Sequence, residues 1–329
     1  FELGLFNNRI RLEGDFYDSQ SIDLLLNVPV PTITGYSTQM QNIGKVQNRG
    51  MEFTLNTKNL TGEFAWSSNF NISFNKNKVL EVGVDGRPIY GSAANANNAF
   101  ITKPGYPIAS FYGYKYIGVF QSEEELAKYP HLSGDEVGDG RYEDVNKDGV
   151  LDQNDKTILG DNNPLFTAGF SNSFSYKNFT LDIQFTGSYG AEVFSFYKRM
   201  CGIYHGDRNG MIEQLGRWQS KDQPGDGIHF RPTRTPSGWQ RDPSSAWVQD
   251  ASYLRLRNLT LGYNFDQKVL DKMKMKGLRL YVTGQNLFTI TNYVGYDPET
   301  SSESGLAQGG DYLGYPAARS FIIGANITF

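Results

Sequence analysis

The chain has 329 residues and a formal net charge of -4, so it is long enough for two soluble domains or one larger β architecture. The small net charge favours neither nucleic acid nor an anionic membrane surface as a partner. A single cysteine, Cys201, excludes an internal disulfide framework and a cysteine-based zinc site. No apolar run approaches the roughly 18 residues that a transmembrane helix needs.

Composition points to an all-β chain. Aromatic residues make up 14% of the sequence, and there are 36 glycines; aromatic residues favour strands and glycines favour turns. The first long alternation lies at 9–17, where Ile10 and Phe16 share one face and Arg9 and Arg11 share the other. A period of two is typical of a strand with one apolar and one polar face.

The same alternation recurs along the whole chain and predicts nine strands. These cover residues 1–5, 9–17, 47–57, 64–75, 165–176, 179–189, 252–265, 277–289 and 319–329. The phase changes near Asn258, where a β-bulge at Arg257 or Asn258 would return Leu254 and Leu261 to a common face. Most of the strands run about 9 to 13 residues, which exceeds the roughly 5 to 6 of soluble strands and suits a membrane-spanning strand.

Aromatic residues gather near strand ends, as in the interfacial girdle of a membrane barrel; they include Trp66, Tyr176, Tyr263 and Phe329. Short connections alternate with long ones at 18–46, 76–164, 190–251 and 290–318. Residues 110–120 also resemble a strand, but placing them inside the 76–164 excursion puts every long loop on one rim. This layout predicts an antiparallel outer-membrane β-barrel with long extracellular loops.

The alternation also fixes which face meets lipid. A one-residue slip of the 9–17 strand would turn Arg9 and Arg11 towards lipid, at roughly 2–4 kcal/mol each near the midplane. The aromatic faces are therefore expected to touch lipid and the polar faces to line a lumen. The alternative is a soluble antiparallel sandwich, which alternates in the same way. The chain opens already in strand alternation, and we expect it to be the C-terminal part of a larger barrel, or another polypeptide segment to supply the remaining strands.

Several segments together resemble the C-terminal part of the SusC/RagA family of TonB-dependent outer-membrane transporters. They are NIGKVQNRGMEF at 42–53, FYGYKYIGVFQSEEEL at 111–126, YEDVNKDGVLDQND at 142–155, SYLRLRNLTLGY at 252–263, LRLYVTGQNLFT at 278–289 and GYDPE at 295–299. The terminal GANITF ends in Phe329, similar to the C-terminal aromatic that the barrel-assembly machinery reads. The resemblance extends over nearly the whole chain.

The resemblance implies a 22-stranded barrel closed by an N-terminal plug. Members of the family import oligosaccharides or peptides, driven through TonB, and a SusD-like surface lipoprotein closes over the outer rim. It further implies a location in the Gram-negative outer membrane and no enzymatic activity. The plug, the TonB box and the earlier strands are not in this sequence.

Residues 144–155 have the ligand spacing of a calcium loop, in which six to eight oxygens come from one short segment. The expected ligands are the side chains of Asp144, Asn146, Asp148, Asp152 and Asp155 and the carbonyl of Val150. Gly149 occupies the sharp turn and Leu151 the apolar position. The glycines and proline around the loop argue against flanking helices, so we expect a structural calcium ion, with magnesium possible, that orders the long 76–164 loop. The alternative is an Asx-rich turn whose acids are only solvated.

The 190–251 loop holds three of the four tryptophans, Trp218, Trp239 and Trp247. These side chains could contact a ligand or a lid protein, or fold the loop on itself. The histidines, His131, His205 and His229, lie in no catalytic motif. Two other functions stay open at this point: a secreted β-rich binding module with a dockerin-like calcium loop, and a β-rich glycoside hydrolase.

Overall fold

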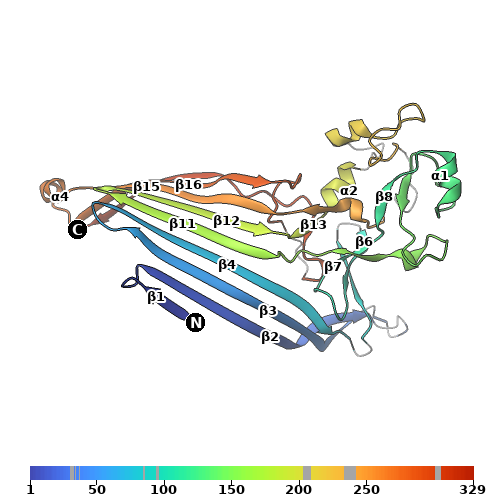
Figure 1. The fold of residues 1–329 in the computed structure, drawn as a ribbon, viewed down its shortest axis with the longest axis horizontal. Helices are drawn as coiled ribbons and strands as arrows, with labels where there is room; N and C mark the ends of the chain where they lie inside the picture. The colour runs from blue at the N-terminus through green and yellow to red at the C-terminus, as the bar shows by residue number, and fades with distance from the viewer. Residues whose placement is uncertain are drawn as a thin grey trace.

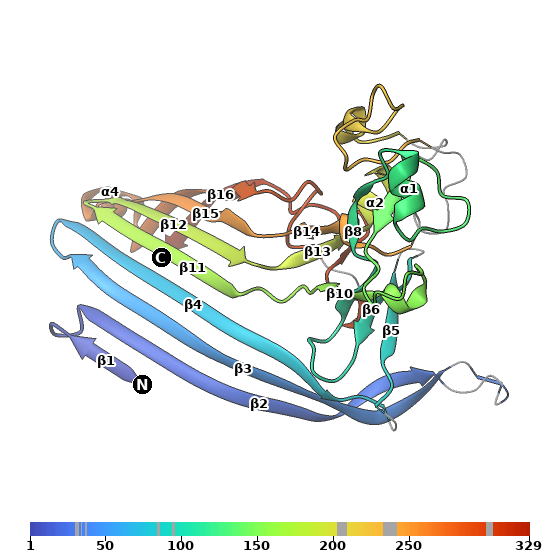
Figure 2. The same cartoon turned by 45° about the vertical axis from the view of Figure 1, so that its right-hand side comes forward.

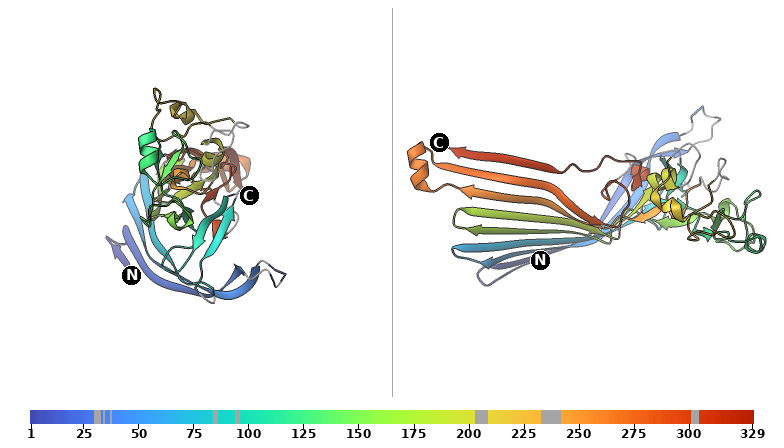
Figure 3. Two further views of the ribbon diagram at one scale, coloured as in Figure 1. Left: turned by 90° about the vertical axis from the view of Figure 1, so that its right-hand side faces the viewer. Right: turned by 90° about the horizontal axis from the view of Figure 1, so that it is seen from above.

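One curved antiparallel sheet forms the wall of the molecule in the computed structural model, which describes residues 1–29, 33, 35–36, 38–83, 86–93, 96–202, 209–232, 242–300 and 305–329. Nine strands build it in sequence order, with β1 and β18 at its edges (Figure 3). They are β1 (Glu2–Leu5), β2 (Ile10–Pro29), β3 (Thr38–Leu60), β4 (Phe64–Glu81), β11 (Phe166–Tyr176), β12 (Phe179–Tyr189), β15 (Tyr253–Asn264), β16 (Gly277–Thr291) and β18 (Ser320–Thr328). All nine predicted wall strands are therefore confirmed, and consecutive strands pair as antiparallel neighbours.

The two faces of this sheet differ as the alternation predicts. Side chains of the apolar face are exposed: Phe179 by 53%, Phe321 by 72% and Ile323 by 84%. The opposite face carries polar pairs such as the Asn69 amide, which donates to Asn56 at 2.6 Å. Within the described residues no second sheet covers the apolar rows, which rules out a soluble sandwich, since such a core buries those rows. An apolar surface of this extent is typical of contact with a membrane.

The phase change near Asn258 is a bulge, as predicted. The register of β15 shifts between Leu256 and Asn258 against both neighbouring strands. Leu254 then pairs with Ile290, and Leu261 pairs with Val282. One extra residue thus returns both leucines to the apolar face.

The predicted 18–46 loop is wrong. β2 and β3 continue as one long paired hairpin, and residues 30–37 alone separate them. Two register irregularities, around Ser21 and Leu24, interrupt the pairing. The alternation is lost there because residues 18–21 are all polar and Leu24, Leu25 and Leu26 are consecutive apolar residues, so a period-two pattern no longer marks the strand.

All long connections leave the sheet at one end, and α4 (Gln267–Met273) and the chain's C-terminus lie at the other (Figure 1). The long connections fold into small sheets: β5 (Ile89–Ala93), β6 (Ala96–Thr102), β7 (Ser110–Gly113) and β10 (Thr157–Gly160); β8 (Tyr116–Val119) with β9 (Gly140–Tyr142); and β13 (Glu192–Ser195), β14 (Val248–Asp250) and β17 (Gly310–Asp311). Residues 110–120 therefore lie outside the wall, as predicted. Among the described residues the 3-10 helices are η2 (Gln153–Asp155), η3 (Ile212–Gly216), η4 (Ser245–Trp247) and η5 (Gly305–Ala307). The α-helices described besides α4 are α1 (Glu123–Lys128) and α2 (Phe196–Gly202).

Two of the long connections share a hydrophobic core. Phe100 and Phe111 from the 76–164 excursion pack with Phe194, Phe196 and Trp247 from the next one. The excursion also contacts the wall, because the Val79 amide donates to the Tyr106 carbonyl at 2.8 Å. The loop end is thus a packed layer that joins distant parts of the chain (Figure 2). Burial of these aromatic side chains orders it.

Among the described residues, no helix has the length and apolar content needed to cross a lipid bilayer.

Candidate functional site

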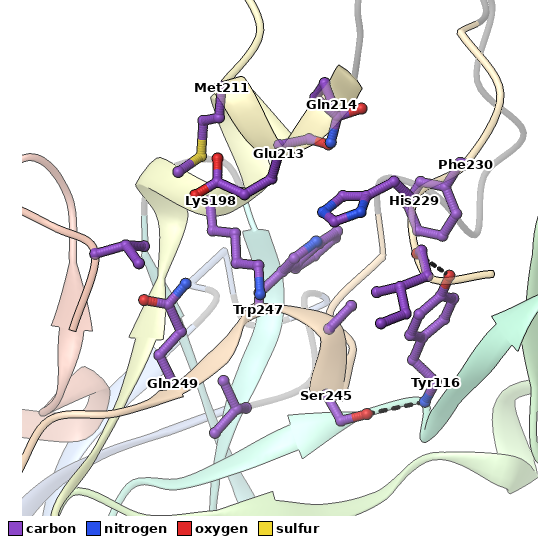
Figure 4. A pocket seen from close by; sticks show the side chains of 15 residues that line it. Tyr116, Lys198, Met211, Glu213, Gln214, His229, Phe230, Ser245, Trp247 and Gln249 are labelled. Carbon is purple, nitrogen blue, oxygen red and sulfur yellow. Dashed lines mark hydrogen bonds between the residues drawn. The ribbon is translucent and has the colours of Figure 1, made fainter. Parts of the chain in front are cut away.

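A pocket of about 380 Å³ opens in the layer formed by the long connections (Figure 4). Its walls come from six separate segments: β8, α2, η3, the 228–230 turn, η4 with β14, and the segment of Val294. Residues that line it include Tyr116, Lys198, Met211, Glu213, Ile228, His229, Phe230, Trp247 and Gln249. Most of this lining is apolar or aromatic with a few polar groups, as in small-ligand sites.

Aromatic contacts fix the floor of the pocket. Trp247 is only 2% exposed and packs edge-on against Phe194, with 5.9 Å between ring centroids. Tyr116 meets Phe230 edge-on at 5.2 Å, and its hydroxyl donates to the Ile228 carbonyl at 2.5 Å. Burial raises the pKa of Tyr116 well above that of a free tyrosine. These rings are therefore held in place before any ligand enters.

Charged side chains face the same space. Lys198 extends from α2 towards Trp247, and Glu213 reaches in from η3 (Figure 4). Burial lowers the pKa of Lys198, and the Glu213 carboxylate opposes that shift. The buried Oε1 of Gln249 has no hydrogen-bond partner within the described part of the chain. The pocket therefore offers a cation and an anion above an apolar floor.

The His229 ring is paired with the side chain of Asp226. Its Nδ1 lies 2.6 Å from Asp226 Oδ2. Burial would raise the pKa of Asp226, but hydrogen bonds from the backbone amides of His229 and Ile228 and from the His229 ring outweigh it and lower that pKa. Ser245, the nearby hydroxyl, accepts a hydrogen bond from the Tyr116 amide at 2.9 Å. Among the described contacts, no hydrogen bond joins Ser245 to His229 as in the nucleophile–base pair that acyl transfer requires.

The three predicted tryptophans have different positions. Trp247 lines the pocket, whereas Trp218 packs beside the shared core and lies over Gly138. Trp239 lies outside the described residues. Sequence reasoning missed Lys198, Glu213 and Gln249, because these residues belong to no motif and only folding brings their segments together.

The calcium-type loop has the backbone path that its spacing predicts. Gly149 adopts φ +84° and Lys147 φ +61°, so the chain turns sharply between the acidic residues. Asp144 accepts hydrogen bonds from the amides of Lys147 at 2.7 Å and Gly149 at 2.9 Å. Leu151 is 5% exposed and packs against Tyr114 and Tyr142, which anchors the loop to the layer below.

Asp155 is the ligand expected at the end of this loop. It is fully buried, and its carboxylate accepts hydrogen bonds from the amides of Val145 at 2.9 Å and Asp152 at 2.8 Å. Asn146 and Asp148 are exposed and hydrogen-bonded to each other at 2.9 Å. No group of three or more histidine, cysteine, aspartate or glutamate side chains is placed to hold a metal ion among the residues that the structure describes.

A buried ion network ties the 292–300 segment to the wall. Arg255 of β15 is 3% exposed and donates to Asp297 at 2.7 Å and to Glu299. Arg257 donates to the other oxygen of Glu299 at 2.5 Å. The resembling segments at 252–263 and 295–299 therefore meet in space. Phe329, the expected assembly signal, is 75% exposed and follows β18 at the end of the wall where α4 lies.

Comparisons with known proteins follow this geometry. No family model matches the chain. The chain is 36% identical over 340 residues to TonB-dependent receptor P3 of Formosa agariphila, with 100% of this chain and 33% of that protein aligned. It is 30% identical over 339 residues to TonB-dependent receptor SusC of Bacteroides thetaiotaomicron, with 100% of this chain and 31% of that protein aligned. The chain spans about a third of the length of these relatives.

Solved structures share the fold. The RagAB peptide transporter superposes with a TM-score of 0.80 at 24% identity, over 99% of this chain and 34% of the solved chain. The RagAB peptide importer in its closed-closed state gives a TM-score of 0.78 at 23% identity, over 100% of this chain and 34% of that one. The chain belongs to the SusC/RagA-type TonB-dependent receptors. As a member of this family it forms antiparallel β-barrel wall, and its relatives are named as receptors and transporters rather than enzymes. The strand count of 22 stays a prediction.

Proposed function

We propose that this chain forms the C-terminal part of an outer-membrane importer that takes up oligosaccharides or peptides in a TonB-dependent manner. The observation that carries the proposal is the two-faced sheet: its apolar rows are exposed, its polar rows pair with one another, and every long connection leaves at one rim. Lipid requires a closed strand wall, which further strands beside β1 and β18 would complete. The names of the relatives, TonB-dependent receptor and SusC, support the same activity.

The rim of long connections is then the extracellular one, since outer-membrane barrels have long outer loops and short periplasmic turns. The pocket around Trp247 opens in this layer, where a nutrient arrives. We propose that the pocket contacts the nutrient, and that a SusD-like lipoprotein covers the same rim. The preceding region of the polypeptide would supply the plug and the segment that meets TonB.

A peptide is the first nutrient to test. Lys198 and Glu213 offer opposite charges, which complement the charged groups of a peptide and have no counterpart on a neutral oligosaccharide. Trp247 leaves only 2% of its surface exposed, so little of its ring is free to stack on a sugar. The solved transporter with the same fold is titled a peptide transporter.

The test is uptake by cells that carry the full-length receptor as their sole importer. Labelled peptides and oligosaccharides are supplied with and without a proton-gradient uncoupler, and the receptor is located by membrane fractionation. We expect uptake of one class that stops with the uncoupler and falls at least tenfold in Lys198→Met with Glu213→Gln. Lys268→Met on α4 at the opposite rim is the matched control. Recovery of the receptor as a soluble protein would overturn the proposal.

We further propose that residues 144–155 bind calcium, with magnesium as a weaker substitute. The support is the spacing of oxygen donors and the turn at Gly149, which leaves the side chains of Asn146 and Asp148 exposed beside Asp144. Bound calcium would neutralise these acids and hold the loop on Leu151. In calorimetric titrations with calcium and with magnesium, we expect Asp148→Ala to weaken binding, with Asp222→Ala as control. If chelation by EDTA leaves the protease sensitivity of residues 120–164 unchanged, the ion does not order this loop.

A further inference from the structure

The sheet separates between β4 and β11, because β4 extends beyond the end of its pairing with β11. β4 pairs with β11 from Phe64 as far as Ser73, opposite Thr167, but continues beside β3 to Glu81. Beyond that point its free edge meets the 105–106 turn instead, through the Val79 amide and carbonyl. The fork between β4 and the 161–165 segment leaves a groove of about 630 Å³, called the fork groove below.

Three cations line this groove on the apolar face of the wall. Arg49 is the register partner of Lys76, and Lys78 pairs with Gln47 in the next outward position. All three side chains are exposed, whereas Asn77 and Val79, which alternate with the two lysines along β4, are buried on the other side. Alternation along a strand therefore turns these cations to the same side as the lipid-facing rows.

The apolar side chains of this face lie directly beside the three cations. Met51 pairs with Phe16 on one side and with Phe74 on the other, and all three line the fork groove. Phe16 is 61% exposed and Met51 is 45% exposed. The guanidinium carbon of Arg49 lies 5.3 Å from the centre of the Phe16 ring. A step of two residues along a strand is about 7 Å, so cationic and apolar surfaces lie within the span of one amphiphile.

The cations of the groove outnumber the carboxylates near it, which are Asp161 in the lining and Asp18 opposite Arg49. None of the three cations forms an ion pair within the described residues. Asp161 lines the groove, but its Oδ1 accepts hydrogen bonds from the amide and the side chain of Asn163. Asp18 is the register partner of Arg49, and its Oδ1 accepts a hydrogen bond from the side-chain amide of Gln47 at 2.7 Å. The lining thus carries three cations against one carboxylate, although the whole chain is acidic.

We propose that the fork groove binds a phosphate-bearing lipid of the outer leaflet. Its phosphate lies among Arg49, Lys76 and Lys78, and its acyl chain lies along Phe16, Met51 and Phe74. Basic side chains at the edge of the hydrocarbon region attract anionic headgroups in this way, and compact ammonium and planar guanidinium groups both bind phosphate. This inference rests on the proposed membrane location of the apolar face. It adds a lipid site on the outside of the wall, distinct from the pocket at the rim.

Native mass spectrometry of the full-length receptor in detergent micelles tests the site. The probes are phosphorylated lipid A, the same lipid after phosphatase treatment, and inorganic phosphate as competitor. The test variant combines Arg49→Gln, Lys76→Gln and Lys78→Gln. The matched control combines Lys272→Gln, Lys274→Gln and Lys276→Gln at the opposite rim, with the same loss of three charges.

We expect the fork variant to bind phosphorylated lipid A at least tenfold more weakly and the control to change by less than twofold. Phosphatase treatment should weaken binding to the unmodified receptor by a similar factor. Unchanged binding by the fork variant, or equal losses in both variants, overturns the proposal, as does displacement by millimolar phosphate. Lys78→Gln alone, with heat-modifiable migration on gels as the folding check, covers the case in which the triple variant does not assemble. A receptor that fractionates to the outer membrane yet shows no fork dependence refutes only the lipid site.

Discussion

The buried Arg255–Asp297 pair allows the most quantitative prediction. Asp297 Oδ1 accepts from Arg255 at 2.7 Å and from the Glu299 amide at 3.0 Å, and Oδ2 accepts from the Ala317 amide at 2.9 Å. Asp297→Ala removes all three bonds and leaves a guanidinium that is 3% exposed. Removing one partner of a buried pair costs about 3–5 kcal/mol. Because Glu299 still pairs with Arg255, we expect the lower end, about 3 kcal/mol.

This energy should appear as local opening of the 292–318 segment. At about 1.4 kcal/mol per factor of ten, amide hydrogen exchange there should accelerate about 100-fold, while β15 itself stays protected. Hydrogen exchange of the full-length receptor in micelles, read by mass spectrometry, measures this directly. The control is Glu143→Ala, which breaks an exposed pair with Lys115 at 2.5 Å and should cost at most about 1 kcal/mol. An acceleration below threefold in Asp297→Ala would refute the view that this network holds the segment.

Three further outcomes follow from the same contacts. Burial would raise the pKa values of Asp297 and Glu299, but hydrogen bonds from Arg255 to Asp297 and from Arg257 to Glu299 help to outweigh it and lower the two pKa values below 3.8 and 4.5. Exchange protection of 292–318, corrected for intrinsic rates, should therefore be constant above pH 4.5 and fall as pH drops through the two lower native pKa values. Leu151→Ala should lower the free energy of local unfolding of the loop layer by about 2–5 kcal/mol, since Leu151 is 5% exposed. Val150→Ala is the control: Val150 is 59% exposed, so this free energy should change by less than about 0.5 kcal/mol. Equal effects of the two substitutions would contradict the packing of Leu151 in the core. Ile323→Arg on the apolar face should cost roughly 2–4 kcal/mol and reduce assembled receptor in the outer membrane, and the same change at Asn326, which pairs with Arg279 on the polar face, should be tolerated.

The sequence by itself determined the wall. Strand existence, strand order and the side of each row follow from a period of two, because a pleated backbone sends successive side chains to opposite faces. The phase change at Asn258 was readable for the same reason. The pattern failed at 18–46, where polar residues and then leucines follow one another without alternation. The turn at Gly149 and the burial of Leu151 were also readable, since both depend on spacing within one short loop.

Tertiary structure alone decided the rest. The pocket around Trp247 takes residues from six segments, and Lys198 and Glu213 share it only because α2 and η3 meet. The joint core of Phe100, Phe194 and Trp247 likewise unites loops that are remote in sequence. The fork groove needs the register that sets Arg49 beside Lys76 and the point at which β11 leaves β4. The alternation along one strand indicates whether each residue faces an apolar or a polar environment. Long-range strand pairing determines which residues from different strands lie together.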